Sequence, residues 1–380
     1  MRPVRRRGRL GPLSIVHIIA IELAAVAILA GIGADGNVIA LVTAGLVAVV
    51  LLVVTWTPTA AGWWYERQVV RARLRRRNRA ARAVRPDTVR HRPLTALAGL
   101  APGLTVRAVA DRGATIGVGQ DPGGWFAALS VTGDDRLPLD RLTRLFEDSS
   151  IPVSALAVTS QTVPAPSTLL DPAAPARTSY LELTAHDRVA ADQQVLVAVR
   201  LEPKSAAAAA LTRGGGLTGV DKAVTALVNR TAKVLGGTGL TVRVLDPDAL
   251  VAALAGSCPA TADAGEPAPG AEVWTGWQAA GLAHAGLVLT RWPAHRPDEL
   301  FAALTGLPAD LVNVTITMRP AGSGVETRCV VRVAARPDAL PETVTQAFAL
   351  ADRAGGRLQR LDGRHGPAVW ATAPTAAVLR

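Results

Sequence analysis

Residues 12–56 read PLSIVHIIAIELAAVAILAGIG, then ADG, then NVIALVTAGLVAVVLLVVTW, and they decide how the rest of the chain is arranged. The two apolar runs, residues 12–33 and 37–56, each have about the 20 residues that a membrane-spanning helix needs. The short polar connection around Asp35 forces two such helices into an antiparallel hairpin. Because the first run is long and a second follows at once, we do not expect a cleaved signal peptide. The sequence therefore predicts two transmembrane helices.

Basic charge is concentrated beside this hairpin. Residues 1–92 carry sixteen arginines against four acidic residues, whereas residues 93–380 carry twenty-five basic and twenty-six acidic residues. Lys and Arg close to a span favour the cytoplasmic side of the membrane. We therefore expect the basic N-terminal segment 1–11 and the Arg-rich juxtamembrane segment 63–92 to be cytoplasmic. This predicts a protein that crosses the inner membrane twice and keeps both termini in the cytoplasm.

The segment WWYERQVVRARLRRRNRAARAVR (63–85) follows the second span. Tryptophan is enriched at membrane interfaces, and each basic side chain near an anionic surface gains roughly 1 kcal/mol. The sequence thus predicts contacts with anionic lipid headgroups or with a partner subunit. The residues expected to make them are Trp63, Trp64, Arg67, Arg71, Arg75, Arg76 and Arg77. The alternative is an arm that binds RNA or DNA with salt-dependent affinity, but the electrically balanced body gives no support for a nucleic-acid partner.

Glu22 is an acidic residue near the middle of the first span. A charge there costs roughly 2.5–3.5 kcal/mol on the insertion scale, so a role in binding a partner is one hypothesis. The alternative is that Glu22 is protonated or bonded to Thr43 of the second span. His17 lies five residues earlier, about 140° around the helix, so the two cannot form a proton relay on one face.

The remaining sequence predicts an α+β body in two parts. In residues 93–257, β-patterned runs at 104–111, 114–119, 124–131, 153–163 and 194–202 alternate with helical patterns at 137–149, 205–213 and 218–235. A break rich in Pro, Gly and Ala at 258–271 precedes residues 272–380. There the order is β-α-β-β-α-β, the order of ferredoxin-like sandwiches. We therefore expect a mixed α/β cytoplasmic domain whose C-terminal part is ferredoxin-like.

Two motifs resemble ligand-binding motifs of enzymes, but a structural explanation is favoured for each. The triple glycine at 214–216 lies between two helices and lacks the strand before it and the GK[ST] or GxGxxG pattern of a phosphate-binding loop, so a turn with positive φ is favoured. Asp246-Pro247-Asp248 could hold a metal and a nucleotide-sugar, but an aspartate followed by proline before an apolar run is typical of a helix N-cap. We therefore expect no catalytic residue, cofactor or metal.

The histidines and cysteines also suggest no reaction. His284 lies in an apolar run typical of a core histidine, whereas His365 is expected in a Gly-rich turn that could line a surface groove. Cys258 and Cys329 have no CxxC spacing, so both are expected to be free thiols.

The combined motifs resemble the EccE subunits of actinobacterial type VII secretion systems. The resemblance rests on the double span with its Arg-rich flank and on the stretches VRLEPKSAAAAALTRGGGLTGVDKAVTALV (199–228), RVLDPDALVAAL (243–254), WTGWQAAGLAHAGLVLTRWP (274–293), VNVTITMRP (312–320) and LQRLDGRHGPAVWATAP (358–374). It implies a subunit of an inner-membrane secretion complex, beside a multi-span channel subunit and an FtsK-like ATPase. It also implies a cytoplasmic domain likened to glycosyltransferase folds, with no agreed catalytic residues to carry over.

Two functions therefore compete. The first is a non-catalytic membrane subunit of a type VII protein secretion complex, which anchors and packs against the channel and ATPase subunits. The alternative is a membrane-tethered, glycosyltransferase-like enzyme that uses a nucleotide-sugar held by Asp246 and Asp248. No Walker A motif is present, so energy for transport would come from another chain.

Overall fold

In the computed structural model the described residues are 9–10, 13–33, 38–59, 62–133, 137–148, 151–164, 175, 178–179, 182, 190–261, 264–266, 268–295, 297–307, 309–322 and 324–379. The chain forms two compact units, residues 3–75 and residues 76–380. Most of the basic N-terminal segment 1–11, the turn at Asp35 and most of the connection 164–177 lie outside the described residues.

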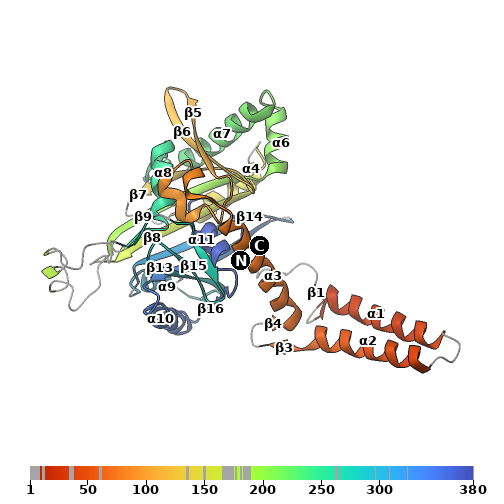
Figure 1. Cartoon of the computed structure of the whole chain (residues 1–380). Coiled ribbons are helices and arrows are strands. Elements are labelled where there is room, and N and C mark those ends of the chain that lie inside the picture. Colours follow the sequence, from red (N-terminus) through yellow and green to blue (C-terminus); the bar gives the residue numbers. More distant parts are fainter. Residues whose placement is uncertain are drawn as a thin grey trace. The chain divides into compact units, whose positions relative to one another are not determined.

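The first unit is built on a helical hairpin. Helices α1 (Ile15–Ile32) and α2 (Val38–Trp56) lie side by side (Figure 1), and both are long and apolar enough to cross a membrane. Small side chains fill the seam between them, because small residues let two helices approach closely. Buried in this seam are Ala20, Ala24, Gly31 and Ala48. A Cβ added to Gly31 would lie 2.8 Å from the Cβ of Ala44.

Short elements flank the hairpin, and a longer helix follows it. The two-residue strands pair as β1 (Arg9–Leu10) with β2 (Leu13–Ser14), and as β3 (Pro58–Thr59) with β4 (Gly62–Trp63). Helix α3 (Trp64–Arg82) contains most of the Arg-rich segment. Its residues up to Arg75 belong to the first unit, and its last two turns belong to the second.

In the second unit, one antiparallel sheet of twelve strands runs through the described residues. Neighbours follow the order β11-β12-β13-β15-β14-β8-β9-β7-β6-β5, with β10 beside β7 and β16 beside β13. The strands are β5 (Thr105–Asp111), β6 (Ala114–Asp121), β7 (Gly124–Thr132), β8 (Ala155–Pro164), β9 (Ala190–Leu201), β10 (Thr241–Val244), β11 (Ala271–Val273), β12 (Gly276–Ala279), β13 (Leu282–Arg291), β14 (Leu311–Ala321), β15 (Gly324–Ala335) and β16 (Arg357–Arg360). The helices are η1 (Pro86–Thr88), η2 (Arg92–Leu97), α4 (Leu139–Asp148), α6 (Pro203–Leu211), α7 (Gly216–Gly236), α8 (Pro247–Gly256), α9 (Pro297–Thr305), α10 (Leu340–Arg353) and α11 (His365–Thr372).

The sheet contains the same arrangement twice. The first half (residues 105–256) runs β5-β6-β7-α4-β8-β9-α6-α7-β10-α8, and the second half (residues 271–372) runs β11-β12-β13-α9-β14-β15-α10-β16-α11. The pairing registers correspond as well as the order. Val199 on β9 lies between Ala127 on β7 and Leu156 on β8, just as Val333 on β15 lies between Ala285 on β13 and Val312 on β14. Apart from α6, the two halves therefore share one topology.

The two halves meet edge to edge through β8 and β14, and an approximate two-fold axis passes between these strands. Thr159 pairs with Thr315, and their Oγ1 atoms lie 3.0 Å apart in a buried hydrogen bond. Three residues to either side, Leu156 pairs with Met318 and Thr162 pairs with Val312. Since exchanging the two strands about the threonine pair reproduces this register, the join is symmetric.

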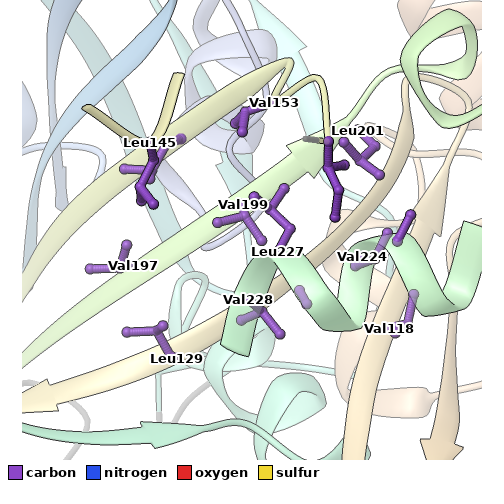
Figure 2. Close-up of a cluster of buried hydrophobic side chains, with 14 of the residues drawn as sticks. Val118, Leu129, Leu145, Val153, Val197, Val199, Leu201, Val224, Leu227 and Val228 are labelled. Carbon is purple, nitrogen blue, oxygen red and sulfur yellow. The ribbon is translucent and has the colours of Figure 1, made fainter. Parts of the chain in front are cut away.

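Helices cover both faces of the sheet. One face packs on α4, α6 and α7 over the first half and on α9 and α10 over the second. Figure 2 shows Val197, Val199 and Leu201 of β9 against Leu227 and Val228 of α7. The alternate side chains of β9 and β15 point to the opposite face, which η2, α8 and α11 cover. Burial of each large apolar side chain contributes about 1.5–3 kcal/mol, so the clusters on both faces of the sheet stabilise the fold.

Candidate membrane and partner contact site

The start of α3 is organised around His17 and three aromatic rings within the first unit. The His17 ring is fully buried, with centroids 4.6 Å from Trp63, 5.7 Å from Trp56 and 5.7 Å from Tyr65. The Trp63 N–H donates to Glu66 Oε2 at 3.2 Å, which is the Glu half of a capping box at the first turn of α3. These contacts tie α1, the end of α2 and the start of α3 together. Trp64 stays 39 % exposed beside them.

Glu22 is exposed on the outer side of the hairpin. Thr43, the bonding partner considered for Glu22, donates instead to the Ile39 carbonyl of its own helix at 2.7 Å. The Glu22 carboxyl therefore lies away from the α1–α2 seam and toward whatever surrounds the hairpin.

The arginines of α3 lie on different sides of the helix. Arg67, Arg75 and Arg76 are exposed, and Arg71 is half-buried. Arg77 was expected to contact the membrane or a partner. Its guanidinium instead binds Glu272 of β11 at 2.8 Å and the Gly363 carbonyl at 2.5 Å. Both partners lie in the second unit, to which Arg77 itself belongs.

Asn78 completes this contact between the end of α3 and the edge of the sheet. Its amide nitrogen donates to the Glu272 carbonyl at 2.7 Å, and its amide oxygen accepts from the Glu272 N–H at 3.3 Å. Ala81 packs on the same side, where a Cβ on Gly99 would lie 2.7 Å from the Ala81 Cβ. With 100° per residue, Arg76 and Arg79 then project from the opposite side of the helix, and both are exposed. No sequence signal indicated this contact, since its partners are almost two hundred residues apart.

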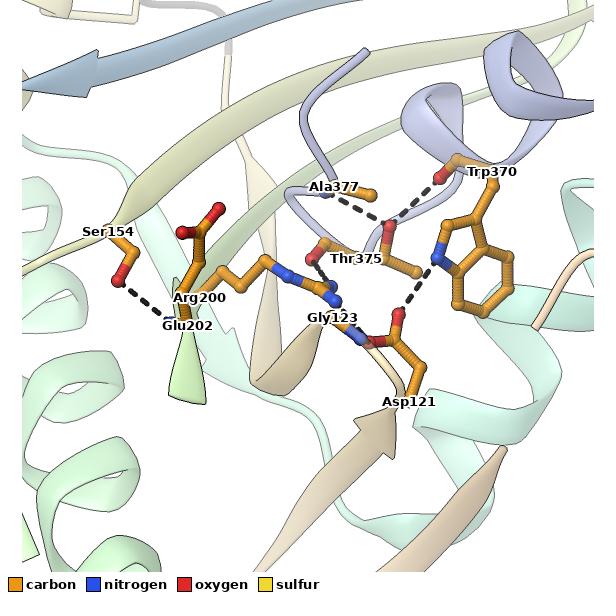
Figure 3. Close-up of polar contacts among 8 residues, drawn as sticks. All are labelled: Asp121, Gly123, Ser154, Arg200, Glu202, Trp370, Thr375 and Ala377. Atoms are coloured by element: carbon orange, nitrogen blue, oxygen red, sulfur yellow. Dashed lines mark hydrogen bonds and ion pairs between the residues drawn. The ribbon is translucent and has the colours of Figure 1, made fainter. Parts of the chain in front are cut away.

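The second unit also buries an ion pair that joins the C-terminal segment to the first half (Figure 3). Arg200 binds Asp121, and both side chains are almost fully buried. Asp121 also accepts from Trp370 Nε1 at 2.9 Å and from the Gly123 N–H at 2.7 Å, while Arg200 donates to the Thr375 carbonyl at 3.0 Å. Because both carboxylate oxygens of Asp121 and both terminal nitrogens of Arg200 have partners, this pair has a structural role.

The second half buries a different polar cluster around Arg332. This side chain donates to Thr372 Oγ1 at 2.7 Å and lies 3.1 Å from His284 Nδ1. Burial lowers the pKa of Arg332 to about 10, so it stays charged at neutral pH. Burial, helped by Arg332, holds the pKa of His284 well below its usual value, so His284 is a neutral core histidine as expected. Burial also raises the pKa of Cys258 to about 12, which makes the thiol unreactive.

The motifs considered for catalysis have structural roles. Asp246 Oδ1 accepts from the Ala249 N–H at 2.8 Å and caps α8, with Pro247 at the first helical position. The triple glycine forms the turn between α6 and α7 with φ of 97°, 73° and 58°. The N-cap and the glycine turn are both confirmed. Within the described ranges, no three His, Cys, Asp or Glu side chains gather to hold a metal ion.

His365 corrects one expectation. The Gly-rich stretch that follows β16 forms helix α11, and His365 is fully buried at its start, so it lines no surface groove. Its Nδ1 accepts from the Gly286 N–H at 3.0 Å, which leaves the proton on Nε2, 3.8 Å from Asp362. Burial works to raise the pKa of Asp362, but contacts with His365 and Arg360 outweigh it and hold that pKa below its usual range.

Comparison with known proteins gives a family match for part of the chain. No curated protein shows a significant match to the chain. Residues 189–288 match a family model described as "Putative type VII ESX secretion system translocon, EccE". The matched segment runs from β9 to β13 and contains the glycine turn, the Asp246 cap and Glu272. Residues 189–288 are therefore similar to the EccE family, and the same chain has two helices long and apolar enough to cross a membrane.

Proposed function

We propose that the chain is a non-catalytic inner-membrane subunit of a type VII secretion complex. In this proposal α1 and α2 cross the membrane, both termini are cytoplasmic, and the body packs against the FtsK-like ATPase and the multi-span channel subunit. The observation that carries it is α3: an Arg-rich helix follows two apolar spans, and its last turns are held on the body by Arg77, Asn78 and Glu272.

Four arginines of α3 give the lipid part of the proposal. Arg67, Arg71, Arg75 and Arg76 face anionic headgroups, with Trp63 and Trp64 at the interface, since aromatic rings and basic side chains favour that depth. Arg77 is instead assigned to holding α3 on the body. Replacing the first four arginines by glutamine should weaken binding of the purified chain to vesicles with anionic lipid, and the remaining binding should depend less on salt.

Glu22 supplies a candidate contact within the membrane. Its exposed carboxyl would be costly against lipid tails, which favours a polar partner on another membrane subunit. Glu22→Leu should then lower complex assembly, and unchanged assembly would remove this contact from the proposal.

The central test is affinity purification of the tagged full-length chain from native membranes in mild detergent, followed by mass spectrometry. The proposal expects an FtsK-like ATPase and a many-spanning membrane protein to be recovered in one large assembly. Recovery of the chain alone, still folded, would overturn it. The transferase alternative has no supporting observation, because the Asp246 carboxylate is used in capping α8.

We also infer that residues 282–360 are a ferredoxin-like unit. The support is the order β13-α9-β14-β15-α10-β16 together with antiparallel neighbours, in which β13 lies between β15 and β16. A crystal structure of the second unit in which β16 failed to pair with β13 would contradict this assignment.

A further inference from the structure

The two halves of the sheet differ most clearly in the connection from β9 to α7 and in its counterpart from β15 to α10. In the second half, residues 336–339 connect β15 directly to α10. In the first half, residues 202–215 connect β9 to α7, and they include helix α6. Helix α6 and its turn into α7 therefore have no counterpart in the second half, although the strands around them correspond residue by residue.

Helix α6 packs closely on α7. The N–H groups of Arg213 and Gly215 both donate to the Ala210 carbonyl at 2.9 Å, which closes the end of α6. Helix α6 lies close against α7, because a Cβ on Gly219 would be 2.7 Å from the Ala210 oxygen. A Cβ on any glycine of the triple-glycine turn would meet nothing within 4 Å, so these glycines serve the backbone conformation alone. The turn therefore lies at the surface, beyond the close contact of α6 with α7.

Two leucines project from this turn into solvent. Leu211 ends α6 and is 80 % exposed, and Leu217 begins α7 and is 51 % exposed. We call these two side chains and the turn between them the α6–α7 tip. In the described part of residues 76–379, Val273 is the one other large apolar side chain that is exposed. Exposed apolar side chains on a protein surface are usually scattered singly, whereas these two flank one turn, which makes the turn a candidate interaction site.

Two exposed lysines lie on the helices that meet at the α6–α7 tip. Lys204 and Lys222 are exposed on α6 and α7, and neither forms an ion pair with any residue that the structure describes. The nearby acid, Asp221, is already bound by Arg107. All three lysines of the chain lie in α6 and α7, the third being Lys233. The complementary surface is an apolar pocket edged by carboxylates, since opposite charges steer and orient association.

A protein fits this tip better than a lipid surface does. Segments that insert at a membrane interface are rich in Trp and Tyr, and residues 203–222 contain no aromatic side chain. The tip also lies inside the segment 189–288 that matches the translocon family.

We propose that the α6–α7 tip is a docking point that inserts Leu211 and Leu217 into a carboxylate-edged apolar pocket on another protein subunit of the complex. This inference rests on the proposed function for the identity of the partner as a translocon subunit. It adds the surface of this chain that the partner recognises and the chemistry of the partner's surface.

The experiment uses the tagged full-length chain in native membranes. Leu211→Ser with Leu217→Ser should lower recovery of at least one co-purifying subunit tenfold or more, because two buried leucine contacts are lost. Val273→Ser is the matched control, since it changes the other exposed apolar side chain of the body, and it should leave recovery unchanged. Leu211→Met with Leu217→Met should restore recovery. Lys204→Gln with Lys222→Gln should weaken recovery at low salt and have less effect at high salt.

A second measurement keeps the inference testable if the serine variant is poorly folded. A photo-crosslinking side chain placed at Leu217 should form an adduct with a different protein chain, and digestion should place the adduct beside Asp or Glu residues. Adducts with lipid, with a second copy of this chain, or with no protein at all would overturn the inference. Full recovery of partners by the serine variant would also overturn it. Failure of the wild-type chain to recover any partner would instead count against the proposed function.

Discussion

The two halves of the sheet each bury one arginine on the same face, yet that arginine has different partners in each half. Arg200 on β9 has the carboxylate of Asp121 as its partner, whereas Arg332 on β15 has neutral His284 and Thr372. The strand register places Ala279 where the first half has Asp121, so the second half carries no acid at that point. Topology therefore determines which positions are buried, and each half satisfies them with its own side chains.

The largest expected effect comes from breaking the charged pair of the first half. Asp121→Ala leaves Arg200 charged and buried without its carboxylate, and we expect a loss of about 3–5 kcal/mol in the free energy of unfolding. Urea unfolding of the detergent-solubilised chain, followed by circular dichroism, measures it. Asp121→Leu combined with Arg200→Met is the control, because it removes both charges and should recover most of the loss. A loss below about 1 kcal/mol for Asp121→Ala would contradict the role of this pair.

Arg332→Met in the second half should have a smaller effect. In this variant no carboxylate loses its partner, but His284 Nδ1 loses its hydrogen-bond donor. We therefore expect a loss of about 1–3 kcal/mol in the free energy of unfolding. The same urea measurement applies, with Arg332→Lys as a variant that keeps the charge but loses the fork of donors. If Arg332→Met cost as much as Asp121→Ala, the contrast between the two halves would be wrong.

His284 should make the second half sensitive to acid. Its pKa in the folded protein is well below the usual value, because burial and Arg332 disfavour the charged ring. Below about pH 6.5 the unfolded chain therefore binds one proton more than the folded chain, and stability falls by up to about 1.4 kcal/mol per pH unit. The stability is fully present above pH 6.5 and is lost as the pH falls toward the folded pKa. Thermal unfolding at pH 5.5 and 7.5 measures the difference.

The corresponding residue of the first half supplies the control for that experiment. Phe126 occupies on β7 the register position of His284 on β13, and it does not titrate. His284→Phe should therefore flatten the dependence on pH between 5.5 and 7.5, whatever it costs in packing. An undiminished dependence in this variant would assign the acid sensitivity to another group.

Sequence patterns predicted the features of this fold that depend on local order. The apolar runs gave the two candidate spans, alternation and helical spacing gave the strands and helices of residues 282–360, and Asp246-Pro247 gave a cap. Helix α11 was missed because Gly366 and Pro367 stand in its first turn, where they resemble a loop. They are tolerated there because the first helical N–H groups need no partner within the helix.

Contacts between distant parts of the chain had no local signal. The pairing of β8 with β14 depends on two strands that each read as ordinary β pattern, so nothing in either indicated the other as its neighbour. The ion pair between Asp121 and Arg200 and the contact of Arg77 with Glu272 also depend on the finished sheet. The two halves keep few identical residues at corresponding positions. The duplication is therefore evident in the strand register and not in the sequence.

The smallest expected effect concerns Asp246 and Asp362, which occupy corresponding places after β10 and β16. Asp246 caps α8, whereas Asp362 makes no cap and binds Arg360 at 2.5 Å. Asp246→Ala should cost about 1 kcal/mol and Asp246→Asn almost nothing, since Asn caps as well as Asp. Urea unfolding checks both values, and a nucleotide-diphosphate titration with Mg²⁺ on the same samples checks the transferase alternative. Metal-dependent binding that both variants abolish would show that the carboxylate has a ligand, because loss of a cap alone cannot explain a defect in the asparagine variant.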